Sequence, residues 1–211
     1  MKILGRFAIV LLFCCALPAA AQNRVLPLDK IKLPPGFTIA LWAEAPNARG
    51  LALGKNGTVF AGSMAEGKVY AITESNGARQ VRIIAQGLNL PVGVAFREGA
   101  LYVSAINRIL RFDDIEQKLD QPGKPVVVSD IFPSEKHHGG RFIAFGPDGY
   151  LYAGNGARTD GGQTGPDTDW YGGGETPITS CIWRLDPKTG EVKVVSYPQP
   201  RSNPYGMVFT S

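Results

Sequence analysis

The sequence predicts an all-β fold with many turns, and two observations support this. Glycine and proline account for 26 and 16 of the 211 residues, and they interrupt every long stretch before a helical apolar spacing develops. Short apolar runs bounded by turn residues recur along the chain instead. Since 44% of the residues are hydrophobic, we expect a folded core rather than a disordered chain.

Three segments align with one another, and each consists of an apolar run, a glycine-containing turn and a second apolar run. They cover residues 51–62, 94–104 and 143–154. In the first, the Asn56-Gly57 pair is typical of a tight hairpin. Two further apolar runs follow each segment, so that we predict additional strands at 68–73 and 80–85, 108–113 and 125–129, and 181–186 and 191–196.

The repeating unit therefore has four strands, and its starts lie about 43 and then about 49 residues apart. Four-stranded units with this spacing are typical of β-propeller blades. The apolar run at 206–209 predicts the first strand of a further unit, and the chain ends inside this strand, at 207–211. We therefore expect a propeller domain over residues 22–211 that contains about three blades and is incomplete at its C-terminus.

Within the third unit, residues 155–179 form a glycine-rich insertion that we predict to be a long loop. Asp167 and Asp169 lie within it, but their spacing favours turn formation over a calcium loop. Cys181 follows the insertion, and its neighbours Ile182 and Trp183 predict a buried strand in which the thiol is a small core hydrophobe.

Residues 1–21 have the pattern of a signal peptide, so we expect a periplasmic or secreted protein. Lys2 and Arg6 precede an 11-residue apolar stretch at 7–17, and small residues at 19–21 fit a cleavage site. This stretch is too short for a stable membrane span. Cleavage lowers the formal charge from +4 to about +2, and no cluster of basic residues remains to track nucleic acid.

The two histidines, His137 and His138, are adjacent and precede Gly139, Gly140 and Arg141 on the connection that enters the third unit. In propellers such connections line the mouth of the central channel. Neighbouring side chains in an extended chain point in opposite directions, so one histidine can face the channel while the other supports it. Glycines let a flat ligand approach the backbone, and Arg141 can bind a carboxylate or cap a strand end. Two adjacent histidines with no third soft ligand nearby do not suit zinc.

Residues from about 31 to 156 resemble the quinoprotein sugar dehydrogenases of the glucose/sorbosone dehydrogenase family, especially its sorbosone-type branch. The most specific match is 133–141, followed by 145–152. The other matching stretches are 33–37, 50–54, 67–70, 91–96 and 107–111.

The resemblance implies a six-bladed propeller that holds pyrroloquinoline quinone (PQQ) together with Ca²⁺. His137 would be the general base that takes the proton from a sugar hydroxyl, and His138, Arg141 and Asn203 would lie in the cofactor site. Asn203 falls on the asparagine of the family's Arg-Asn-Pro-x-Gly motif, whereas Ser202 replaces the arginine and Arg201 stands one residue early. The calcium ligands of the family come from later blades, beyond Ser211.

We therefore expect an exported PQQ-dependent sugar dehydrogenase, present as an N-terminal fragment, that oxidises an aldose or sorbosone-like sugar. His137 and Arg201 would be catalytic, and electrons would pass to an external acceptor. Two alternatives remain open: a non-catalytic propeller that binds a sugar or a partner, favoured by Ser202, and a metal-dependent lactonase-type propeller, for which the sequence places no converging acidic ligands.

Overall fold

The structure is a computed structural model that describes residues 26–132, 134, 139–155, 181–196, 207 and 209. The chain divides into two compact units, Met1–Leu41 and Trp42–Ser211. In the first unit, a short 3₁₀ helix spans Leu28–Lys30, and Gly36 turns the chain with a φ of +84°. None of the helices in the described residues is long and apolar enough to cross a membrane.

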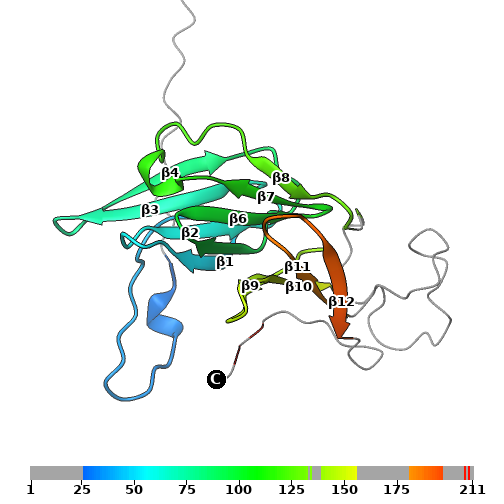
Figure 1. The fold of residues 1–211 in the computed structure, drawn as a ribbon. Helices are drawn as coiled ribbons and strands as arrows, with labels where there is room; N and C mark the ends of the chain where they lie inside the picture. Colours follow the sequence, from blue (N-terminus) through cyan, green and yellow to red (C-terminus); the bar gives the residue numbers. More distant parts are fainter. Residues whose placement is uncertain are drawn as a thin grey trace, which may run out of the picture. The chain divides into compact units, whose positions relative to one another are not determined.

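The second unit is all-β, and its described strands form three four-stranded antiparallel sheets, which follow one another along the chain (Figure 1). The first sheet has the order β1-β2-β3-β4, the second β5-β6-β7-β8 and the third β12-β11-β10-β9. A 3₁₀ helix, Ile115–Gln117, lies between β7 and β8. The strands are β1 (Ala48–Leu53), β2 (Val59–Ser63), β3 (Val69–Ser75), β4 (Ala78–Ala85), β5 (Val94–Arg97), β6 (Ala100–Ala105), β7 (Arg108–Phe112), β8 (Val126–Ser129), β9 (Ile143–Phe145), β10 (Leu151–Asn155), β11 (Cys181–Leu185) and β12 (Val192–Ser196).

This architecture confirms the predicted all-β fold of four-stranded propeller blades, of which three are described. The strands agree with the predicted runs, although β1 begins three residues before the expected start at Leu51. Asn155, predicted to open the insertion, belongs to β10 instead. Met207 and Phe209 lie outside any strand, which differs from the strand predicted at 207–211; the other residues of that segment fall outside the described part.

Equivalent glycines make the tight turns between the first two strands of each blade. Gly57, Gly99 and Gly149 have φ angles of +84°, +82° and +84°, a backbone region that costs other residues free energy. In the first blade the Gly54 N–H donates to the Thr58 carbonyl at 2.8 Å, and the Asn-Gly hairpin prediction is confirmed. The same local chemistry thus starts every blade.

The hydrophobic cores lie between successive sheets. β6 is buried along its whole length because its two faces pack against different neighbours. Leu101 and Val103 join a cluster with Phe60 and Val69 of the first sheet. Tyr102, on the opposite face, joins a second cluster that includes residues of the third sheet. Face-to-face packing of this kind stacks the three blades.

The face of the first sheet that is turned away from the second is only partly covered. Leu51 and Leu53 on β1 are 66% and 68% exposed. Farther across the same sheet, Tyr70 and Ile72 are buried, and Ala43 and Ala45 pack in the same cluster.

Because the strands alternate in direction, the loops of the stack fall into two groups. We call one end of the strands the hairpin edge; it carries the turns β1–β2, β3–β4, β5–β6, β7–β8, β9–β10 and β11–β12. We call the other end the loop edge; it carries the connections β2–β3, β4–β5, β6–β7, β8–β9 and β10–β11 and the segment that follows β12.

Candidate active site

The predicted site residues belong to connections of the loop edge. His137 and His138 stand between β8 and β9, and Arg201 and Asn203 follow β12; all four lie outside the described residues, as do Ser202 and the 156–180 insertion. The described strands that precede these two segments, β8 and β12, both end at the loop edge. Arg141, the remaining predicted residue, is described together with Gly139 and Gly140.

The buried side chain of Ser104 on the second blade binds the segment that leads into the third blade. Its hydroxyl donates to the Arg141 carbonyl at 2.6 Å and accepts the Gly93 N–H at 3.0 Å. Gly93 allows this close approach, because a Cβ there would lie 2.1 Å from the Arg141 carbonyl oxygen and 2.9 Å from the Ile143 nitrogen. The end of the histidine-bearing connection is therefore held tightly at the backbone.

The side chain of Arg141 holds the same segment from within. It is only 2% exposed, and its Nη1 donates to the carbonyls of Ile106 and Gly139, the latter at 2.9 Å. The guanidinium lies over the ring of Phe132, 5.4 Å from the ring centre. Phe132 and Gly139 stand on either side of the two histidines in the sequence, so Arg141 contacts both ends of their connection.

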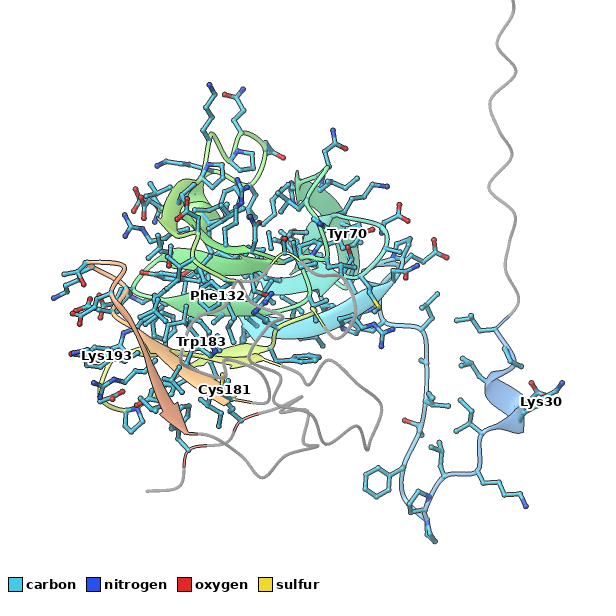
Figure 2. All side chains as sticks on the ribbon, turned by 90° about the vertical axis from the view of Figure 1, so that its right-hand side faces the viewer. Lys30, Tyr70, Phe132, Cys181, Trp183 and Lys193 are labelled. Atoms are coloured by element: carbon cyan, nitrogen blue, oxygen red, sulfur yellow. The ribbon has the colours of Figure 1, made fainter. Side chains whose placement is uncertain are left out.

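Phe132, Trp183 and Cys181, which Figure 2 labels, belong to the hydrophobic cluster that joins the second and third blades. The rings of Phe132 and Trp183 lie 5.0 Å apart, and the Trp183 Nε1 donates to the Cys181 sulfur at 2.7 Å. Cys181 is fully buried, which confirms the predicted core thiol. Burial raises its pKa from 9.0 to about 12, against the opposing influence of Trp183 and Arg141, so the thiol stays protonated near neutral pH.

Of the two roles that the sequence left open for Arg141, the geometry favours capping of a strand end over binding of a carboxylate. The guanidinium is buried and donates to main-chain oxygens. Packing also explains the glycine at position 140, because a Cβ there would lie 2.9 Å from the Val92 side chain. Close approach of the neighbouring blade thus accounts for Gly140 without a ligand.

Sequence reasoning missed two exposed cations at the loop edge. Arg49 stands at the start of β1, where its Nη2 lies 3.2 Å from the Met64 sulfur, and Arg108 stands at the start of β7. The alternation of strand direction, applied to every loop, identifies them, because the matching stretch 107–111 contains Arg108 without assigning it a role and no matching stretch contains Arg49. Exposed guanidinium groups suit the carboxylates of an anionic ligand.

For a metal, the described residues provide no group of three or more His, Cys, Asp or Glu side chains placed to hold an ion. Asp167 and Asp169 lie outside the described part. The described loop edge carries the exposed cations Arg49 and Arg108 and also the acids Glu66 and Asp130.

No family model matches the chain, and no curated protein matches it in sequence. Among solved structures, the chain is similar to the PQQ domain of pyranose dehydrogenase from Coprinopsis cinerea in its holo form, with a TM-score of 0.52 and 12% identity over 69% of this chain and 38% of that chain. It is also similar to PQQ-bound aldose sugar dehydrogenase from Streptomyces coelicolor, with a TM-score of 0.47 and 23% identity over 74% and 47% of the two chains. A gluconolactonase from Xanthomonas campestris gives a TM-score of 0.48 and 14% identity over 71% and 47%.

The chain thus spans less than half the length of each of these proteins. At identities this low, the similarity shows the fold alone, and the chain is a set of β-propeller blades.

Proposed function

We propose that this chain is part of an exported quinoprotein that oxidises an aldose or sorbosone-like sugar with PQQ and Ca²⁺. One observation carries the proposal: the sequence His137-His138-Gly139-Gly140-Arg141 stands on a loop-edge connection, and Arg141 contacts both ends of it. Export to the periplasm or beyond the cell follows from the signal-like residues 1–21.

In the proposed reaction, a ring nitrogen of His137 takes the proton of the sugar hydroxyl while the hydrogen on the same carbon leaves as hydride. PQQ, when bound, would supply the hydride acceptor, and an external acceptor would take up the two electrons. Histidine suits the proton transfer because its ordinary pKa lies near neutrality.

Other groups of the loop edge would bind and orient the cofactor. His138 and Asn203 are proposed contacts, Arg201 would stabilise developing negative charge, and the exposed Arg49 and Arg108 would attract its carboxylates. Arg141 remains part of the proposed cofactor site, and its burial supports a role in anchoring the connection that carries the two histidines. The sorbosone-type branch and the calcium ion are parts of the proposal drawn from the resemblance.

The test is dye reduction by the chain within its full-length protein, loaded with PQQ and Ca²⁺, with aldoses as substrates. His137→Ala should lower the rate by roughly 10²-fold to 10⁴-fold, the usual contribution of a general base. Lys193→Ala, at an exposed position on β12, is the matched control and should keep the full rate. Full activity in His137→Ala would refute the assigned role.

Sugar binding without dye reduction would favour the alternative of a non-catalytic propeller. Hydrolysis of a sugar lactone that depends on a divalent metal would favour the lactonase-type alternative. Both assays use the same protein and therefore separate the three functions directly.

A further inference from the structure

A pocket of about 530 Å³ opens at the hairpin edge, away from the loop-edge connections. Four segments from two blades line it: residues 97–100 and 111–113 of the second blade, and residues 148–150 and 186–188 of the third. Its volume lies within the usual range of small-molecule sites. The pocket does not overlap with the residues assigned to sugar oxidation.

Contacts between the two blades give the pocket its shape. The Arg97 guanidinium lies over the Phe145 ring, 5.3 Å from its centre, and the Phe145 ring meets Tyr102 edge-on at 5.0 Å. Arg111 Nη1 lies 3.5 Å from the Pro187 carbonyl. Lining residues of the second blade therefore contact the third blade directly.

The acidic side chains of the lining are held in place by their own neighbourhood. The Asp113 carboxylate accepts from Arg111 Nε at 2.7 Å, and the Asp148 carboxylate accepts from the Tyr152 hydroxyl at 2.8 Å. Asp186 accepts the main-chain N–H two residues later at 2.8 Å. These hydrogen bonds lower the pKa of Asp148 and of Asp186, so both carboxylates are ionised acceptors at neutral pH.

Several lining groups keep hydrogen-bonding capacity that the described part of the chain does not use. Among donors these are the Nη groups of Arg97, the Lys188 Nζ and the Tyr150 hydroxyl; among acceptors it is the second carboxylate oxygen of Glu98. Donors and acceptors thus face the pocket together. The lining carries three cations and four acids, so its charges nearly cancel.

We propose that this hairpin-edge pocket binds a neutral, polyhydroxylated ligand of mono- or disaccharide size. A sugar hydroxyl donates and accepts at once, so neighbouring hydroxyls can bridge a carboxylate and a guanidinium or ammonium group. The near balance of charge gives an anion or a cation little advantage. Tyr102 and Tyr150 add aromatic surface against which a sugar ring can pack.

The site does not rest on the redox function, because it shares none of its residues. It would bind a carbohydrate at the hairpin edge, whatever chemistry the loop edge performs. Its test therefore uses no PQQ, no calcium and no electron acceptor.

The experiment titrates the ¹⁵N-labelled chain with maltose and follows backbone amide shifts. We expect saturable shifts at 97–100, 148–150 and 186–188, with a dissociation constant on the order of 1 mM. Absence of shifts in these turns at roughly tenfold higher maltose would overturn the proposal. Maltobionate, the anionic acid of the same sugar, is the second probe, and tighter binding of maltobionate than of maltose would refute the neutral ligand class.

Variants locate the site independently. Lys188→Met and Tyr150→Phe each remove one polar tip and should weaken maltose binding about threefold to tenfold, the value of one hydrogen bond. Lys193→Met, on β12 outside the pocket, should leave binding unchanged. Maltose-induced shifts of the loop-edge amides of Arg49 and Arg108, with none in the pocket turns, would place the sugar at the loop edge and refute the proposal.

Discussion

Replacing Arg141 by methionine tests the role of the buried guanidinium as an anchor between blades. The change leaves the carbonyls of Ile106 and Gly139 without their buried donor. Each unsatisfied acceptor costs about 1–3 kcal/mol, and relief from burying a charge offsets part of this. We therefore expect the free energy of unfolding to fall by about 2–4 kcal/mol.

Thermal unfolding followed by circular dichroism measures this effect. For a unit of this size, each kcal/mol shifts Tm by roughly 2–4 °C, so the variant should melt about 5–15 °C lower. Arg108→Met is the matched control, because Arg108 is exposed and, within the described part of the chain, its Nε donates to the side chain of the neighbouring Asn107. It should change stability by less than about 0.5 kcal/mol.

A third variant separates geometry from charge. Arg141→Lys keeps the positive charge but replaces the planar fork with a single ammonium, so it should recover only part of the loss. A Tm for Arg141→Met within about 1 °C of the wild type would refute the reasoning, since two buried acceptors cannot lose their donor without cost.

Three further predictions concern single groups in the same blades. Gly93→Ala should unfold the chain or lower its stability by several kcal/mol, because the new Cβ would lie 2.1 Å from the Arg141 carbonyl oxygen. At Gly57 a Cβ would meet no atom within 4 Å, so Gly57→Ala should cost only about 1–2 kcal/mol of backbone strain. Equal urea midpoints for the two variants would contradict this. Burial raises the pKa of Cys181, so its contribution to stability is fully present below pH 9.0 and is lost as the pH rises toward about 12. In this range the free energy of unfolding of the wild type should fall by about 1.4 kcal/mol per pH unit more than that of Cys181→Ala. Urea unfolding at several pH values measures this difference. Tyr152→Phe removes the hydrogen bond that lowers the pKa of Asp148, so the Asp148 pKa measured by carboxyl NMR should rise, and an unchanged value would show that Tyr152 is not its cause.

The blades could be predicted because their signals are local. Gly57, Gly99 and Gly149 mark equivalent turns, and apolar runs on both sides of each turn have the length of strands. Strand ends were less predictable: the start of β1 at Ala48 depends on pairing with Ser63, which no local pattern shows.

The anchoring role of Arg141 could not be predicted, because arginine is seldom buried and its partners come from elsewhere in the chain. The Ile106 carbonyl belongs to the second blade, and the ring of Phe132 is brought beneath the guanidinium by packing against Trp183. The order of strands explains why several candidate connections share an edge, but the roles of His137 and Asn203 within that edge remain predictions.

The pairing of β10 with β11 has a consequence for how this scaffold accepts new sequence. The two strands pair over five consecutive residues without a register shift, from Leu151 with Leu185 to Asn155 with Cys181, although about 25 residues separate them. Closing such a loop costs only about 1.4 kcal/mol more than closing one of five residues, because the entropy of closure grows with the logarithm of length. A blade can therefore lengthen at the loop edge at little cost in stability, so segments that alter binding can be gained there while the sheet below keeps its register.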